Sequence, residues 1–283
     1  MKTIHEPHLM QREADDLRVA GKRIVLVPTM GALHGGHTAL IREARTLGDV
    51  VVVTLFVNPA QFGEGEDYGR YPRDIERDAL LASGAGGDLL FAPETTAMYP
   101  PGYQTFVNVE RLSLRLEGAA RPGHFRGVAT VVAKLFNIAR PHSAVFGQKD
   151  AQQVIVLRRM VRDLDLGVEI VVVPTLREQD GLAMSSRNVY LTPAQRVEAP
   201  VLYRSLRKAE DLIRSGERSA GAVVAAMTLE ITGGSSAAID YVSVADADTL
   251  APLVTLSPGA PVLVSLAARF WTTRLIDNIH IRL

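Results

Sequence analysis

The sequence predicts an α/β protein: a doubly wound parallel sheet, followed by a smaller C-terminal α+β domain that contains an antiparallel sheet. Short apolar runs alternate with segments of helical periodicity through about the first 175 residues, the pattern of strands joined by crossover helices. After Pro174 two helical patterns come first and several strand patterns follow. We therefore expect two domains, residues 1–175 and residues 176–283.

The elements of the first domain follow from its apolar runs. These runs predict strands at Arg23–Val27, Val50–Val57, Asp88–Ala92, Ala144–Phe146 and Glu169–Val173. Helical spacing between them predicts helices at His37–Leu47, Asp74–Ala82, Val128–Arg140 and Asp150–Leu164. The second strand is apolar except for Thr54, as expected of a strand covered on both faces.

In the second domain, Thr192 is a helix N-cap and Pro193 suits the first helical position. We expect one long helix from there toward Ser215 and another over about Ala220–Ile231. A turn at Gly233–Ser236 then leads into an antiparallel sheet. Its predicted strands are Ile239–Val244, Pro261–Phe270 and Arg274–Ile281.

The composition narrows the class of partner. Lysine plus arginine and aspartate plus glutamate number 31 each, so no net charge draws the protein to nucleic acid or to anionic lipid. The chain has no cysteine, which excludes disulfides, thiolate catalysis and cysteine zinc sites. No apolar run has the length of about 18 residues that a membrane span needs, and the N-terminus lacks the apolar core of a signal peptide. We expect a cytoplasmic protein with no nucleic-acid or membrane partner.

The stretch Pro28–His37 follows the first strand and ends where a helix begins. His34 and His37 therefore lie where unpaired backbone N–H groups and the positive end of the helix dipole favour an anion. Two imidazoles there can donate hydrogen bonds to phosphate oxygens. The alternative is a helix-capping or surface pair; a zinc site would need a further His or Cys nearby. The glycine-rich surroundings favour phosphate binding.

Three further polar clusters each follow a predicted strand. The amides of Asn58 and Gln61 suit a small ligand with hydroxyl and carboxylate groups, although Asn-Pro alone is often only a turn. In Gly147–Gln153, Lys149 can hold phosphates, whereas a solvated lysine beside a helix-capping Asp150 is the alternative. Met184–Asn188 offers two hydroxyls and a guanidinium as an anion clamp, or merely a helix cap. Ligands of open parallel sheets bind at the carboxyl ends of the strands, so together these positions indicate one nucleotide site.

The order of the motifs adds a resemblance to a known family. The chain resembles the pantoate–β-alanine ligases, which share a His-x-Gly-His signature with other adenylate-forming nucleotidyltransferases. The segments that carry this resemblance are Pro28–His37, Phe56–Phe62, Tyr71–Arg73, Arg121–Phe125, Gly147–Gln153, Met184–Asn188 and Arg274–Asn278. The histidine signature alone marks only the superfamily, whereas the full set is specific.

The resemblance implies a fold and a reaction. It implies a Rossmann-like N-terminal domain, a smaller C-terminal domain that closes over the site, and a homodimer. It implies that pantoate attacks the α-phosphorus of Mg-ATP, giving pyrophosphate and a pantoyl adenylate, and that the amine of β-alanine then displaces AMP to give pantothenate. ATP is then a substrate that enters with Mg²⁺, and no tightly bound organic cofactor is expected. The alternatives are another adenylyltransferase of the superfamily and a non-catalytic nucleotide-binding protein.

The resemblance also implies roles for particular residues. His37, His34 and Lys149 are the expected catalytic residues, with His37 the proton donor to the phosphates. Gln61 and Gln153 are expected to bind pantoate, with Gln61 also near β-alanine and Asn58 in the same pocket, and Asp78 is a candidate for the magnesium environment. The expected ATP-binding residues are Met30, Gly31, Ala32, Leu33, His34, Gly35, Gly36, His37, Gly147, Gln148, Lys149, Asp150, Leu176, Met184, Ser185, Ser186 and Arg187.

Three positions depart from the family pattern. Gln148 stands where glutamate is usual, Ala60 where methionine is common, and Ala151 where an aromatic residue is common. None of these has an expected catalytic role. They bear on pocket packing and affinity and leave the reaction unchanged.

Overall fold

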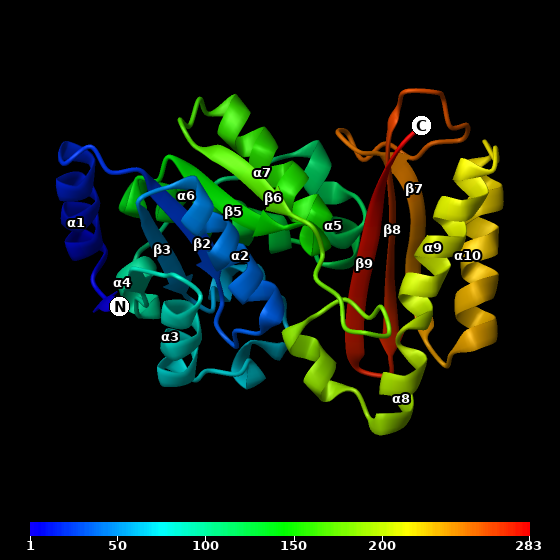
Figure 1. Ribbon diagram of the computed structural model, residues 1–283, viewed down its shortest axis with the longest axis horizontal. Helices are drawn as coiled ribbons and strands as arrows, with labels where there is room; N and C mark the ends of the chain where they lie inside the picture. Colours follow the sequence, from blue (N-terminus) through cyan, green and yellow to red (C-terminus); the bar gives the residue numbers. More distant parts are fainter. The chain divides into compact units, whose positions relative to one another are not determined.

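The computed structural model describes all of residues 1–283, and the chain forms two compact units (Figure 1). The first unit comprises Met1–Gly147 and Val156–Pro174, and the second comprises Gln148–Ile155 and Thr175–Leu283. The short segment Gln148–Ile155 therefore belongs with the C-terminal part of the chain, although it interrupts the first unit in sequence.

The first unit contains a six-stranded sheet in which every strand pair is parallel. The order of the strands is β1-β4-β3-β2-β5-β6. Their bounds are Lys2–Ile4 (β1), Ile24–Thr29 (β2), Val50–Leu55 (β3), Leu89–Phe91 (β4), Ser143–Gly147 (β5) and Glu169–Val173 (β6). The chain winds from β2 through β3 to β4 on one side and reaches β5 and β6 on the other. The switch point of the topology, where such sheets bind ligands, thus lies between β2 and β5.

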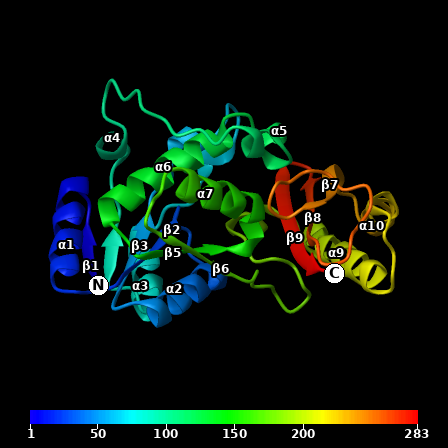
Figure 2. The same cartoon turned by 90° about the horizontal axis from the view of Figure 1, so that it is seen from above.

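Helices cover both faces of this sheet. Figure 2 shows α2 and α3 on one face and α6 with α7 on the other. The helices that this unit contributes to are Pro7–Val19 (α1), Gly35–Leu47 (α2), Ile75–Gly84 (α3), Thr95–Met98 (α4), Glu117–Ala120 (α5), His124–Ala139 (α6) and Ala151–Asp163 (α7). Short 3₁₀ turns lie at Pro59–Gln61, Asp67–Arg70 and Arg111–Leu114.

The core of the first unit explains why the strands are apolar on both sides. Val25 and Val27 of β2 and Val51 and Val53 of β3 pack in one buried cluster with Ile41 of α2. The strand residues between them face the other side of the sheet and are also fully buried, as Ile24, Leu26 and Val52 are. Because side chains alternate between faces along a strand, burial on both faces requires a continuous apolar run.

The second unit is built on a three-stranded antiparallel sheet with the order β7-β8-β9. The strands are Ala238–Asp246 (β7), Pro261–Phe270 (β8) and Thr273–Arg282 (β9), and the helices are Pro193–Glu198 (α8), Val201–Arg214 (α9) and Ala220–Gly234 (α10). Helices α9 and α10 lie side by side, and their apolar faces share one buried cluster with the sheet. A 3₁₀ turn, Ser186–Tyr190, precedes α8. No helix in residues 1–283 is long and apolar enough to cross a membrane.

The predicted fold class is confirmed, with differences in detail. The expected single helix from Pro193 toward Ser215 is wrong: α8 ends at Glu198 and α9 begins at Val201, because Pro200 has no N–H to continue the helical ladder. The strand β1 and the helices α1, α4 and α5 were not predicted from the sequence. β1 has only three residues, too few to show a period, and it adds an edge strand beside β4.

Candidate active site

The loop between β2 and α2 is held by its own histidines. His34 is the N-cap of α2, and its Nδ1 accepts a hydrogen bond from the backbone N–H of Gly36 at 3.1 Å. The Nδ1 atom of His37 accepts from the backbone N–H of His34 at 3.3 Å, which completes a capping box. The two rings are tilted against each other with their centroids 4.2 Å apart. The sequence expectation that these histidines share the start of a helix therefore matches their positions.

This capping box selects the tautomer of both imidazoles. A nitrogen that accepts a hydrogen bond carries no proton, so in each neutral ring the proton lies on Nε2. Both histidines can then present an Nε2–H donor at the N-terminus of α2, where the helix dipole adds a positive potential. The arrangement is chemically suited to an anion that accepts hydrogen bonds.

The same loop adopts a backbone conformation that needs support. Gly31 has φ +88° and Ala32 has φ +51°, which for alanine is a sparsely populated region. The carboxylate of Asp78 in α3 accepts from the N–H of Ala32 at 2.7 Å and from the N–H of Leu33 at 2.8 Å. Only 1% of Asp78 is exposed. Asp78 therefore fixes the loop that leads to the histidines.

Asn58 and Gln61, which follow β3, are joined to each other and to the loop after β2. Asn58 donates to the Oε1 atom of Gln61 at 3.0 Å, and the Nε2 atom of Gln61 donates to the sulfur of Met30 at 3.1 Å. Asn58 also donates to the carbonyl of Gly127 at 3.1 Å and accepts from Ala60 N–H and from the hydroxyl of Tyr99. The side chain of Asn58, only 1% exposed, thus uses both donors and its acceptor inside the protein. It holds Gln61 in place.

The segment Arg121–Phe125 supports Gln61 from the other side. His124 donates from Nδ1 to the carbonyl of Gln61 at 2.8 Å, and the Nη1 atom of Arg121 lies 3.1 Å from His124 Nε2. An arginine can only donate, so Nε2 of His124 must accept and the ring must be neutral. Burial, with the Arg121 charge second, lowers the pKa of His124 from 6.5 to about 4.

Arg121 is itself fixed by Glu66. Its Nε and Nη2 atoms each donate to one carboxylate oxygen of Glu66 at 2.7 Å. Burial works to raise the pKa of Glu66, but the hydrogen bonds and the charge of Arg121 outweigh it, and the pKa lies below its usual value. Glu66, Arg121 and His124 thus form a chain of contacts that ends on the backbone of Gln61.

Gly147 ends β5 beside α2. A Cβ atom on Gly147 would lie 4.0 Å from a methyl group of Leu40 in α2. Gly147 therefore lies at the switch point of the sheet, close to the helix that the two histidines begin.

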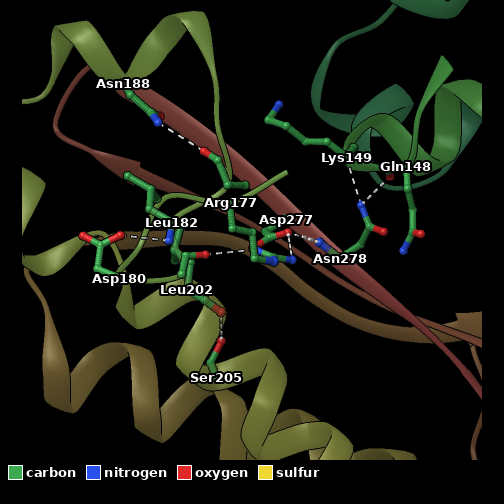
Figure 3. A network of polar contacts seen from close by, with 12 residues as sticks. Gln148, Lys149, Arg177, Asp180, Leu182, Asn188, Leu202, Ser205, Asp277 and Asn278 are labelled. Atoms are coloured by element: carbon green, nitrogen blue, oxygen red, sulfur yellow. Dashed lines mark hydrogen bonds and ion pairs between the residues drawn. The ribbon is translucent and has the colours of Figure 1, made fainter. Parts of the chain in front are cut away.

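In the second unit, the residues after Gly147 form a 3₁₀ turn, Gln148–Asp150, that leads directly into α7. The Nζ atom of Lys149 lies 3.8 Å from a carboxylate oxygen of Asp150. The side-chain amide of Asn278 in β9 donates to the carbonyls of both Gln148 and Lys149, at 3.0 Å and 2.9 Å (Figure 3). Gln153 follows one helical turn after Lys149 and is partly exposed. The turn is therefore anchored from a strand about 130 residues away in sequence.

The candidate anion clamp lies at the end of a small hairpin in the same unit. Met184 N–H donates to the carbonyl of Leu176 at 2.9 Å, and Arg177 pairs with Ala183 across the hairpin. The hydroxyl of Ser185 then accepts from the N–H of Arg187 at 3.2 Å and starts the 3₁₀ turn Ser186–Tyr190. The structure thus brings together Leu176 and the segment Met184–Arg187.

Several residues that hold these groups have no role that the sequence predicts. Arg121 and His124 were found only as part of a motif. Tyr99 directly follows α4, a helix too short to show a periodic pattern, and nothing in the sequence indicates that its hydroxyl reaches Asn58. Asp277 and Asn278 were found only as the end of a motif, because their contacts are far away in sequence.

Comparison with known proteins agrees with the architecture. The sequence profile of the family described as pantoate-beta-alanine ligase matches residues 2–280. The pantothenate synthetase of Moorella thermoacetica is 57% identical over 262 residues, covering 93% of this chain and 92% of that protein. The crystal structure of pantothenate synthetase from Thermus thermophilus has a TM-score of 0.91 at 48% identity and covers 100% of both chains. That of a pantoate-beta-alanine ligase from Francisella tularensis, complexed with beta-gamma ATP and beta-alanine, has a TM-score of 0.76 at 31% identity, covering 99% of this chain and 97% of that chain.

A doubly wound parallel sheet whose strands lead into histidine, amide and lysine clusters defines an α/β enzyme of Rossmann-like architecture. The match of the family profile to residues 2–280 then identifies the enzyme family. The chain belongs to the pantoate–β-alanine ligase family. The resemblance found in the sequence is thereby confirmed.

Proposed function

We propose that this protein ligates pantoate and β-alanine to pantothenate at the expense of ATP, through a pantoyl adenylate. Membership of the pantoate–β-alanine ligase family over residues 2–280 carries the proposal. The solved relative from Francisella tularensis, named as a complex with beta-gamma ATP and beta-alanine, supports ATP and β-alanine as substrates.

In the first step a carboxylate oxygen of pantoate attacks the α-phosphorus of ATP. The bond between the α-phosphorus and the bridging oxygen breaks, and pyrophosphate leaves with the electron pair. Such a displacement needs positioning and charge stabilisation more than covalent help from the protein. We assign this task to the Nε2–H donors of His34 and His37 and to the cations of Lys149 and Arg187.

In the second step the amine of β-alanine attacks the acyl carbon of the adenylate and AMP leaves. The nitrogen loses a proton as the amide forms, and the AMP phosphate takes up the electron pair of the broken acyl–oxygen bond. We assign Gln61 and Gln153 to the hydroxyl and carboxylate groups of pantoate. The contacts of Asn58 support a role in holding Gln61, not in touching substrate.

We propose that Mg²⁺ enters on the triphosphate of ATP. In residues 1–283 no group of three or more His, Asp or Glu side chains is arranged to hold a metal ion. Mg²⁺ commonly keeps several waters and is bound through substrate phosphates, which fits a site with few protein ligands. Asp78 remains a candidate for the magnesium environment, although both of its oxygens already accept backbone hydrogen bonds.

The remaining expectations also stand as proposals. Residues 176–283 are proposed as the smaller domain. The protein works as a cytoplasmic homodimer on small-molecule substrates, without a nucleic-acid or membrane partner and without a tightly bound organic cofactor.

The experiment that tests the proposal is pantoate-dependent exchange of labelled pyrophosphate into ATP in the absence of β-alanine. Exchange that requires pantoate supports the adenylate. Exchange with another acceptor but not with pantoate would indicate a different adenylyltransferase, and ATP binding without exchange would indicate a non-catalytic protein.

A further inference from the structure

Two neighbouring residues of β9, Asp277 and Asn278, contact both segments of the second unit to which the proposed function assigns ATP. Both are buried, with 3% of each residue exposed. Figure 3 shows them between the turn that carries Lys149 and the hairpin that carries Arg177 and Leu182. Neither has an assigned role in binding substrate.

Asn278 fixes the Lys149 turn through the backbone. Its Nδ2 atom donates to the carbonyls of Gln148 and Lys149 at once. Two hydrogen bonds from one planar amide to consecutive carbonyls fix the position and the orientation of the turn. The direction in which the Lys149 side chain leaves the backbone follows from that orientation.

Asp277 fixes the hairpin through Arg177. The Nη1 and Nη2 atoms of Arg177 donate to the two carboxylate oxygens of Asp277 at 2.6 Å and 3.0 Å, a bidentate pair. The same guanidinium donates to the carbonyl of Gly181 at 3.1 Å and lies 3.8 Å above the ring of Tyr203. Arg177 pairs with Ala183, the residue before Met184, so this contact holds the start of the clamp Met184–Arg187.

Asp277 and Asn278, the two anchors, are also joined to each other by a hydrogen bond. The backbone N–H of Asn278 donates to Oδ1 of Asp277 at 2.8 Å. Burial raises the pKa of the Asp277 carboxyl, and the charges of Arg177 and Lys149 work against that rise. Removing the Asp277 carboxylate would leave the mostly buried charge of Arg177 without its partner, which is destabilising.

We propose that Asp277 and Asn278 are positioning residues that set the geometry of the two phosphate-binding segments of the second unit relative to each other. Asn278 orients the turn of Lys149, and Asp277 orients the clamp through Arg177. The inference rests on the proposed function, because it takes Lys149 and Arg187 to act on the phosphates of ATP.

The test is a double-mutant cycle in the pantoate-dependent pyrophosphate exchange assay. Asn278→Ala removes both hydrogen bonds to the turn and is expected to slow exchange on the order of 10- to 100-fold, as a displacement of about 1 Å does. In a Lys149→Ala background the same substitution is expected to have almost no further effect, because the group it positions is gone. A merely structural role would slow both backgrounds equally.

Asn278→Asp and Ser265→Ala complete the design. Asn278→Asp has the same shape but places an oxygen against the two carbonyls, so it should be at least as slow as Asn278→Ala. Ser265 is opposite Asn278 in β8 and is 5% exposed, and its hydroxyl makes no hydrogen bond within the protein. Ser265→Ala perturbs the same part of the sheet without touching the turn and should exchange at the wild-type rate.

Arg177→Lys tests the second anchor. It keeps a cation beside the buried carboxylate, which protects the fold, but loses the bidentate geometry. Its effect should disappear in an Arg187→Ala background. If wild type exchanges pyrophosphate and either cycle is additive, this inference is wrong while the proposed function stands. If wild type shows no pantoate-dependent exchange, the proposed function fails and this inference fails with it.

Discussion

His37 and Lys149 are the side chains whose loss should affect the chemical step most. We expect His37→Ala and Lys149→Ala each to slow adenylate formation roughly 10²–10³-fold, because each removes one preorganised donor to the phosphates. Single-turnover measurement of pyrophosphate release checks this, with unfolding curves to show that both variants remain folded. Rates close to wild type in either variant would contradict its role.

Asp78 should matter through the backbone that it holds. In Asp78→Asn one of the two N–H groups of Ala32 and Leu33 loses its acceptor, so we expect a loss of about 1–3 kcal/mol in the free energy of unfolding and slower exchange of pyrophosphate. Arg77, whose guanidinium lies 3.8 Å from Asp78 and is 57% exposed, offers the control. Arg77→Gln should change little. Equal unfolding midpoints in urea for wild type and both variants would show that the hydrogen bonds from the loop to Asp78 do not stabilise the protein.

His124 should make the protein less stable in mild acid. Its pKa in the folded protein, about 4, lies below the ordinary value of 6.5, so between pH 6.5 and pH 4 the unfolded chain binds a proton that the folded chain excludes. Stability from this group is therefore complete above pH 6.5 and decreases as the pH falls toward 4, by about 3 kcal/mol.

His124→Asn can keep the donor to Gln61 without titrating. Urea unfolding at pH 7 and pH 5 should show a smaller decrease in stability for this variant than for wild type. An equal decrease in the two proteins would place the acid sensitivity elsewhere.

For single residues, the sequence predicts which residue types lie together at the site, but it does not predict the contacts that fix their positions. The histidine spacing indicates a pair at a helix start because the signal is local. That Asp78 clamps the loop backbone, or that Asn278 anchors Lys149, depends on contacts 45 and about 130 residues apart in sequence, respectively. No local pattern encodes such contacts.

The start of α8 tests whether a capping motif that is recognisable in the sequence stabilises the protein. The hydroxyl of Thr192 accepts from the N–H of Gln195 at 3.3 Å, and the Gln195 side chain accepts from the N–H of Thr192 at 3.0 Å. We expect Thr192→Ala to cost about 1 kcal/mol of unfolding free energy and Thr192→Ser to cost much less. Chemical denaturation measures both, and indistinguishable losses would mean that the cap hydroxyl does not stabilise the helix.

Elements were predictable where the pattern is long and continuous. Glu169–Val173 and Pro261–Phe270 have the predicted bounds. The helix before β5 begins at His124, four residues earlier than expected. The break at Pro200 could have been predicted from the missing N–H, and the long amphipathic pattern on either side concealed it.

For the whole molecule, substrate binding should appear as added stability. A ligand that binds only the folded state at a concentration of 100 times its Kd adds about 2.7 kcal/mol. We expect a non-hydrolysable ATP analogue with Mg²⁺ to raise Tm by several degrees, and GTP at the same concentration to raise it much less. Thermal unfolding monitored by circular dichroism checks this, and an unchanged Tm with the ATP analogue at saturating concentration would argue against an ATP site.

The fold class was predictable as a whole because alternating strands and helices admit few topologies. Which residues make up each unit was not predictable, because no sequence signal assigns Gln148–Ile155 to the C-terminal unit. That assignment follows from contacts such as those of Asn278 with Gln148 and Lys149.

The path of the chain therefore crosses from one unit to the other three times, after Gly147, after Ile155 and after Pro174. No single cut can separate the units with their parts complete. A fragment ending at Pro174 would retain all six strands of the parallel sheet but would carry the Lys149 turn without the amide that anchors it. For the same reason, the C-terminal half cannot be transplanted onto a relative by one fusion junction without also exchanging eight residues from the middle of the other half.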